Sequence, residues 1–196
     1  LLSDGVPAAI LRLIPEGGEP DEIRQVAARP LGIRRRLGLP DDAPLVVNVA
    51  ALVEHKDQHT LIRAAAAGRA LHPDLHWAIA GRGALRSALE QAIRDAGVAS
   101  HVHLLGYVEE ADALIREANV LVMSSKEEGL GTVVLNALAL GTPVVATSAG
   151  GLVDVIPAAW RVPVGDAAAL ARRVVAAVVE RPTVALPERF TAHAMA

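Results

Sequence analysis

The residues best suited to chemistry lie in the segment SSKEEGLGTVVLN (124–136), where two acids and two glycines precede an almost wholly apolar run. Gly129 and Gly131 follow a predicted strand and precede a predicted helix, so the free N–H groups of the first helical turn would bind an anion, most often a phosphate. Glycine also lets a ligand approach the backbone closely, because it carries no Cβ. An ordinary strand-to-helix turn explains the same glycines, and the pair alone does not decide between these interpretations.

Glu128 adds a second requirement to this predicted anion site. A carboxylate beside a phosphate repels it unless the carboxylate faces another group, and hydroxyl donors are groups that a carboxylate binds well. A phosphate attached to a polyol satisfies both conditions. In the alternative, Glu127 and Glu128 only stabilise the helix dipole, by about 0.3–1 kcal/mol. We expect one of the two acids to have only this role.

Lys56 and Asn136 are two further candidates. Lys56 is predicted to follow the first strand at the start of a helix, where a cation opposes the helix dipole and so indicates a phosphate ligand, although a lone lysine in such a loop is usually solvated. Asn136 is the single polar residue of the run 133–140, so its amide needs a partner inside the fold or on a ligand. A sugar hydroxyl and a neighbouring strand are equally acceptable partners.

Other motifs are excluded by their spacing. His55 and His59 have the spacing of a zinc-binding helix, but Lys56 occupies the place of the glutamate base, so we predict no metal site. The segment GRG (81–83) begins like a dinucleotide fingerprint, but Arg86 occupies its third glycine position. P-loop and α/β-hydrolase patterns are absent from the sequence.

The elements that position these residues alternate between short apolar runs and helical patterns, which is typical of βαβ units. The predicted strands are Leu45–Ala51, His76–Gly81, His101–Leu105, Val120–Ser124, Pro143–Thr147 and a short sixth at Arg161–Val164. The predicted helices are Lys56–Ala70, Ala84–Asp95, Glu110–Glu117, Thr132–Leu140, Gly151–Ile156 and Ala167–Val179. Right-handed crossovers then give an α/β fold with a doubly wound, mostly parallel sheet and helices on both faces, and such sheets bind ligands at the carboxyl ends of their strands.

Composition restricts the class of protein further. The chain has 196 residues, of which 52% are hydrophobic and 21% charged, and this favours one globular core. A net charge of -3 argues against a nucleic-acid partner. The absence of cysteine excludes a disulfide framework and favours a reducing compartment, so we predict a cytoplasmic location. No apolar run reaches the roughly 18–20 residues that a membrane span needs, and we predict no transmembrane segment.

The domain organisation is predicted from turn-forming residues and helical patterns. Residues 1–20 are expected to be an inter-domain linker, because IPEGGEP (14–20) is rich in turn formers. A Rossmann-like domain is expected at 21–180, with a charged helix at IRRRL (33–37), and residues 181–196 are expected to begin a C-terminal crossover segment. The chain starts without methionine and stops within a helix-like pattern, so a fragment of a longer protein is expected.

The segment EGLGTVVLNALALGTPVVAT (128–147) resembles the signature of retaining family 4 glycosyltransferases, Glu-Gly-x-Gly-x-x-x-x-Glu-Ala-x-Ala-x-Gly-x-Pro-Val-Val-Ala-Thr. The similarity continues in ALVEHKD (51–57), GYV (106–108) and GGLVDVI (150–156), and it covers nearly the whole chain. Those enzymes have two Rossmann-like domains, the GT-B architecture, and the second domain holds most of the nucleotide-sugar donor. The resemblance implies that this chain is that second domain.

The resemblance also implies a role for each matching position. Lys56 would contact the donor's diphosphate, Glu128 the hydroxyls of the transferred sugar, and position 136 the ribose. The amides of residues 131–133 would bind phosphate, and Val108 and its neighbours the base. The implied catalytic residues are Glu128 and Lys56, and the implied donor-binding residues are Gly129, Leu130, Gly131, Thr132, Val133, Asn136, Val108, Tyr107 and Arg82. The implied donor is a UDP-sugar or GDP-sugar, with no metal or other cofactor.

Two positions depart from the family pattern. Ala51 stands where an arginine is usual, and a lost charge-assisted bond to phosphate costs about 1.5–3 kcal/mol unless Arg82 replaces it. Asn136 stands where the second acid is usual, and a neutral amide binds a ribose hydroxyl about 1 kcal/mol less strongly. These changes affect affinity and donor choice, because phosphate neutralisation and positioning supply most of the expected catalysis.

The predicted function is donor binding in a retaining glycosyltransferase that transfers a hexose-type sugar to an acceptor held by a missing N-terminal domain. The fragment alone is expected to be inactive, and peripheral membrane contact of the full-length enzyme stays open. The alternative is a non-catalytic nucleotide-sugar-binding or regulatory module with a decayed site. An epimerase would need further acid and base residues, and a pyridoxal-phosphate phosphorylase a suitable lysine, whereas only Lys56 and Lys126 are present.

Overall fold

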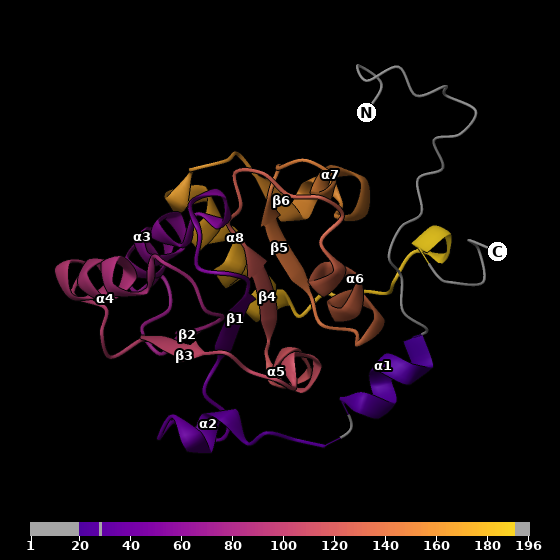
Figure 1. The fold of residues 1–196 in the computed structure, drawn as a ribbon, viewed down its shortest axis with the longest axis horizontal. Coiled ribbons are helices and arrows are strands. Elements are labelled where there is room, and N and C mark those ends of the chain that lie inside the picture. Colours follow the sequence, from indigo (N-terminus) through magenta and orange to yellow (C-terminus); the bar gives the residue numbers. More distant parts are fainter. Residues whose placement is uncertain (1–19, 28, 191–196) are drawn as a thin grey trace.

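Parallel strands form one sheet in the order β3-β2-β1-β4-β5-β6 (Figure 1). The computed structural model describes residues 20–27 and 29–190, and within them the sheet has six strands. Their bounds are β1 Leu45–Val49, β2 His76–Ala80, β3 Val102–Gly106, β4 Val120–Met123, β5 Val144–Thr147 and β6 Arg161–Val162. The chain order reverses between β1 and β4, which is the switch point where doubly wound sheets bind ligands. The predicted fold class is confirmed.

Helices cover both faces of the sheet (Figure 1). One face packs against α3, α4 and α8, and the other against α2, α5, α6 and α7. The helix bounds are α1 Pro20–Val26, α2 Ile33–Arg36, α3 Gln58–Gly68, α4 Arg86–Asp95, α5 Ala111–Glu117, α6 Thr132–Ala139, α7 Leu152–Val155 and α8 Ala167–Glu180. Short 3-10 turns are η3 Glu54–Lys56, η4 Ala158–Trp160 and η5 Glu188–Phe190.

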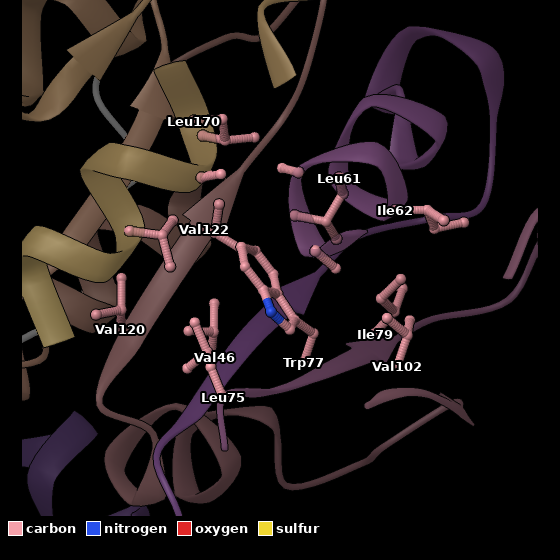
Figure 2. Close-up of a cluster of buried hydrophobic side chains, with 14 of the residues drawn as sticks. Val46, Leu61, Ile62, Leu75, Trp77, Ile79, Val102, Val120, Val122 and Leu170 are labelled. Atoms are coloured by element: carbon pink, nitrogen blue, oxygen red, sulfur yellow. The ribbon is translucent and has the colours of Figure 1, made fainter. Parts of the chain in front are cut away.

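Strand β1 shows why an unbroken apolar run forms a central strand. Val46 packs into the core between the sheet and helices α3 and α8. Leu45 and Val47 pack into the core on the opposite face, between the sheet and helices α5 and α6. Successive side chains of a strand point to opposite faces, so a strand covered on both faces needs apolar residues at every position. Trp77 of β2 is 1% exposed and fills the first of these cores beside Leu61 (Figure 2).

The prediction that a helix begins at Lys56 is wrong. Lys56 ends the η3 turn, and α3 begins at Gln58. Asp57 separates the two elements with a left-handed backbone (φ 46°), and its carboxylate accepts the N–H of Thr60 at 3.2 Å. This side-chain cap satisfies a backbone donor at the start of α3. The cap fixes the loop after β1, where Lys56 lies.

The segment before β1 is attached to the domain by polar contacts. The Glu117 carboxylate accepts the N–H groups of Gly32 at 2.9 Å and Ile33 at 2.8 Å, and Arg34 donates to the Asn119 side chain at 2.9 Å. The charged helix predicted at 33–37 is α2, whereas α1 was not predicted as a separate helix. The linker prediction falls outside the described residues apart from Pro20, as does the crossover prediction beyond 190. No described helix is long and apolar enough to cross a membrane.

Candidate functional site

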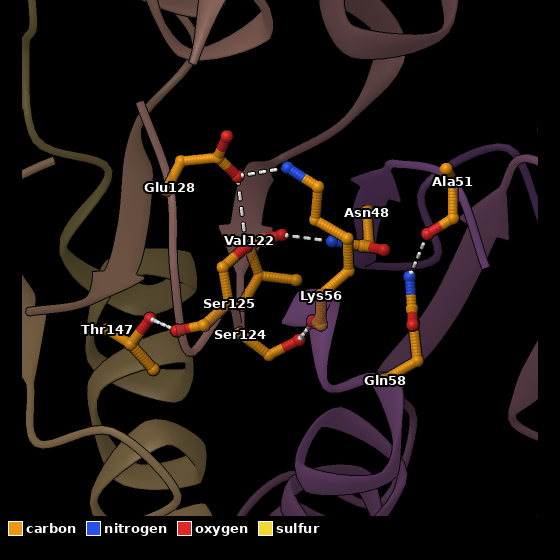
Figure 3. Close-up of polar contacts among 9 residues, drawn as sticks. All are labelled: Asn48, Ala51, Lys56, Gln58, Val122, Ser124, Ser125, Glu128 and Thr147. Atoms are coloured by element: carbon orange, nitrogen blue, oxygen red, sulfur yellow. Dashed lines mark hydrogen bonds and ion pairs between the residues drawn. The ribbon is translucent and has the colours of Figure 1, made fainter. Parts of the chain in front are cut away.

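Lys56 and Glu128 meet at the carboxyl edge of the sheet, where the loops after β1 and β4 lie side by side. Lys56 Nζ donates to Glu128 Oε2 at 2.6 Å, although the two residues are 72 positions apart in the chain (Figure 3). Their side chains are 18% and 9% exposed, so the pair is largely shielded yet reachable from solvent. Both residues were predicted as site residues from their separate loops, and the fold joins them.

Ser125 also holds this carboxylate. Its Oγ donates to Glu128 Oε2 at 3.0 Å, and the other carboxylate oxygen points away from both donors (Figure 3). The carbonyl of Ser125 accepts the Thr147 hydroxyl at 2.6 Å, and the Ser124 hydroxyl donates to the Lys56 carbonyl at 2.9 Å. Sequence reasoning missed Ser125 and Thr147, although hydroxyl residues where apolar strands end could have indicated them.

Two glycines after β5 allow the Glu128 loop to take its position. A Cβ on Gly150 would lie 1.9 Å from the Glu128 carbonyl oxygen, and Gly150 has a left-handed backbone (φ 48°). The N–H of Gly151 donates to the same carbonyl at 3.1 Å, and a Cβ there would lie 2.8 Å from the Gly129 oxygen. The loop after β5 therefore supports the Glu128 loop through close backbone packing that only glycine permits.

Helix α6 begins directly beside this acid. Gly131 precedes the helix with a left-handed backbone (φ 67°) and supplies no side-chain cap. The N–H groups of Thr132 and Val133 donate to no acceptor within the described part of the chain, so they carry the positive end of the helix dipole. Open space surrounds the Cβ position of Gly129, whereas Leu130 packs partly against the core. The arrangement suits an anion at the helix start.

A cavity of about 430 Å³ lies at the ends of β1 and β2, beside the loop after β3. Its lining includes Ala51, Arg82, Tyr107 and Val108. The Arg82 guanidinium lies over the Tyr107 ring, 5.2 Å from its centroid, and Tyr107 is 63% exposed. Arg82 thus shares a cavity with Ala51, the position where the resemblance leaves an arginine missing.

Asn136 has its partner inside the fold, which was one of the two alternatives, but the partner lies on a helix and not on the neighbouring strand. Its Nδ2 donates to Asp112 Oδ1 at 3.0 Å, which joins α6 to the first turn of α5. Both residues are half-buried. Asp112 follows Ala111, which lines the cavity at β1 and β2, and Asn136 lies one helical turn after Thr132. Asp112 was missed because nothing in the sequence links these two helices.

Among residues 20–27 and 29–190, no group of three or more histidine, cysteine, aspartate or glutamate side chains could hold a metal ion. Charged residues at the strand ends include Lys56, Glu128, Arg82 and Asp112, and Glu109 also lines the cavity that contains Arg82. A ligand that satisfies them has an anionic part and hydroxyl groups.

The fold is that of a Rossmann-like domain, and a lysine, a glutamate and the uncapped start of α6 lie together at its strand ends. The family model "Glycosyl transferases group 1" matches residues 32–194, so the chain belongs to this family. The structural neighbours are GT-B glycosyltransferases.

Curated relatives include several glycosyltransferases. The lipopolysaccharide core biosynthesis glycosyltransferase LpsE of Rhizobium meliloti is 37% identical over 118 residues, which cover 60% of this chain and 34% of the relative. A GDP-mannose-dependent mannosyltransferase of Mycolicibacterium smegmatis that acts on phosphatidylinositol monomannoside is 36% identical over 76% of this chain and 41% of its own length. The 2-deoxystreptamine glucosyltransferase of Streptomyces kanamyceticus is 28% identical over 87% of this chain and 46% of its own. The chain thus spans between a third and a half of these relatives.

Solved structures resemble the chain over nearly its full length. HepE of Anabaena in complex with UDP has a TM-score of 0.82 at 21% identity, covering 99% of this chain and 57% of HepE. Sucrose-phosphate synthase of Thermosynechococcus elongatus has a TM-score of 0.69 at 28% identity, covering 94% of this chain and 49% of the synthase. The likeness to HepE establishes the shared fold.

Proposed function

We propose that this chain is the donor-binding, C-terminal domain of a retaining family 4 glycosyltransferase, which transfers a hexose-type sugar from a UDP-sugar or GDP-sugar. The contact between Lys56 and Glu128 beside the uncapped start of α6 carries this proposal. In this proposal the cation and the free N–H groups would bind the diphosphate, and the carboxylate would accept from the hydroxyl groups of the sugar. The relatives that use GDP-mannose and the neighbours solved with UDP support the same class of donor.

The remaining parts of the donor fit the neighbouring surfaces. The cavity beside Tyr107 and Val108 would receive the base, since its lining is mainly apolar and an aromatic ring stands at its edge. The ribose would lie between this cavity and α6, where Asp112 accepts from its hydroxyls and Asn136 orients that carboxylate. Arg82 would supply the second cation near the phosphates.

The chemistry asked of the domain is stabilisation of a leaving group. Transfer breaks the bond between the anomeric carbon and the diphosphate oxygen, and negative charge grows on that oxygen. Lys56 and the N–H groups at α6 would stabilise this charge without a metal ion, and Glu128 would fix the sugar. The acceptor would be bound by an N-terminal domain outside this chain, so the chain alone would turn nothing over.

Calorimetry with UDP, GDP and their hexose conjugates tests the proposal. We expect the isolated chain to bind one of the two nucleotides with a dissociation constant in the micromolar to low millimolar range, about −4 to −8 kcal/mol. The full-length enzyme is expected to form a glycoside product from the matching donor. A folded chain that binds neither nucleotide at millimolar concentration would refute the donor assignment, and a full-length enzyme that binds without product would favour the non-catalytic module.

A further inference from the structure

Two donors of different kinds hold Glu128. Its Oε2 accepts from the Lys56 ammonium group at 2.6 Å and from the Ser125 hydroxyl at 3.0 Å. The ammonium group is charged and ends a long, flexible side chain, whereas the hydroxyl is neutral and lies close to the backbone. The two contacts must therefore respond differently when an anionic ligand enters the site.

The proposed donor alters the first contact, and this step rests on the proposed function. A diphosphate carries more negative charge than one carboxylate, so it competes for the ammonium group of Lys56. If the Glu128 carboxylate moved together with the Lys56 ammonium group, it would lie against the phosphate and repel it. The site needs a hold on Glu128 that does not depend on Lys56.

The position of Ser125 is fixed independently of Lys56's charge. Ser125 is 1% exposed, and its carbonyl accepts the Thr147 hydroxyl at 2.6 Å. The N–H of the next residue, Lys126, donates to the His55 carbonyl at 2.7 Å. These contacts tie the backbone at Ser125 to the end of β5 and to the loop after β1. Because Ser125 is uncharged, an entering anion does not draw it away from Glu128 as it draws the ammonium group of Lys56.

We propose that Ser125 is a positioning residue that keeps the Glu128 carboxylate directed at the sugar while Lys56 binds the diphosphate. The carboxylate oxygen that points away from Lys56 and Ser125 is then the acceptor for the sugar hydroxyls (Figure 3). Within the described part of the chain, these two side chains are the only ones that hold the Glu128 carboxylate. Ser125 thus makes recognition of the sugar independent of the ion pair.

Ser125→Ala, measured by calorimetry on the isolated chain, tests this role. UDP and GDP are titrated first. If UDP binds, UDP-glucose is titrated next, and if GDP binds, GDP-mannose is titrated next. In the variant we expect the affinity for the bare nucleotide to change by less than about twofold. The ratio of nucleotide-sugar affinity to bare-nucleotide affinity is expected to fall about five- to tenfold below that of the wild type. Ser124→Ala, which removes a buried hydroxyl one residue away, is expected to leave this ratio unchanged.

Thermal unfolding of the variants separates positioning from damage to the fold. Equal losses for the bare nucleotide and the nucleotide-sugar would overturn the positioning role, and so would an unchanged ratio in Ser125→Ala. Failure of the wild-type chain to bind any nucleotide would refute the proposed function, and this inference with it. Nucleotide binding with an unchanged ratio would refute the inference alone.

Discussion

The side-chain amide of Asn136 lies 3.0 Å from the carboxylate of Asp112 and so places an acid of α5 beside the position where the family signature has its second acid. The signature's acid is thus absent from position 136, but a carboxylate is still present in its neighbourhood. An amide that donates to a carboxylate fixes the direction in which its free oxygen points. The proposed ribose contact therefore belongs to Asp112.

Asp112→Asn tests the ribose contact by comparing UDP or GDP with the 2′-deoxy nucleotide. We expect affinity for the ribonucleotide to fall about five- to tenfold, because a charged acceptor becomes neutral, while affinity for the deoxynucleotide changes little. Titration calorimetry measures both. Glu110→Gln is the matched control, since it removes the same charge at the start of the same helix. Equal loss for both nucleotides would count against a ribose contact.

Glu128→Gln in the full-length enzyme separates sugar recognition from nucleotide binding. We expect turnover to fall about tenfold to hundredfold, because the sugar loses a charged acceptor and its alignment. The bare nucleotide is expected to bind at least as tightly, since a negative charge beside the phosphate is removed. Steady-state kinetics and calorimetry give the two values, with the exposed Glu127→Gln as control. Similar losses in both would mean that Glu128 does not contact the sugar.

Gly150→Ala tests how the Glu128 loop is supported. The new Cβ meets the Glu128 carbonyl oxygen at 1.9 Å, and the backbone there is left-handed, so the loop must shift. We expect a loss of about 1–3 kcal/mol in the free energy of unfolding, together with loss of nucleotide-sugar binding. Gly141→Ala is the control, because its backbone is also left-handed but its Cβ meets open space. Equal effects of both variants on binding would refute the packing argument.

His76 of β2 and His103 of β3 predict a pH dependence of stability. His76 Nδ1 lies 3.3 Å from His103 Nε2, and His101 stacks on His76 with ring centroids 5.3 Å apart. Burial lowers the pKa of His76 and of His103, and a neighbouring histidine lowers each pKa further, whereas Asp74 partly opposes the shift at His76. The folded state therefore keeps His76 and His103 neutral at pH values where the unfolded chain already binds protons.

Stability should consequently decrease as pH falls from about 6.5, the usual histidine pKa, toward the lowered pKa values of the folded state. Above about pH 6.5 the contribution of these histidines to the free energy of unfolding is constant. Thermal unfolding between pH 5 and 7.5 measures this, and His103→Gln is expected to flatten the curve. A variant that retains the full pH dependence of the wild type would show that other groups cause it.

The sequence was sufficient to predict the elements that are marked by a pattern of neighbouring residues. Each central strand is a short apolar run because helices cover both faces of the sheet, and this pattern is visible without the structure. The start of α3 was not predictable from periodicity, because Asp57 ends η3 and caps α3 through its own side chain. Such a boundary depends on one hydrogen bond, which a pattern of apolar residues does not register.

The sequence by itself determined the class of fold, and it predicted the loops at the strand ends, with Lys56 and Glu128, as the candidate site. Only the tertiary structure decided which residues from distant parts of the chain touch: Lys56 with Glu128, Asn136 with Asp112, and Arg82 with Tyr107. The physical reason is the order of the strands. Pairing of β1 with β4 brings together loops that are 72 residues apart, and side-chain contacts across them follow from that pairing rather than from any spacing along the chain.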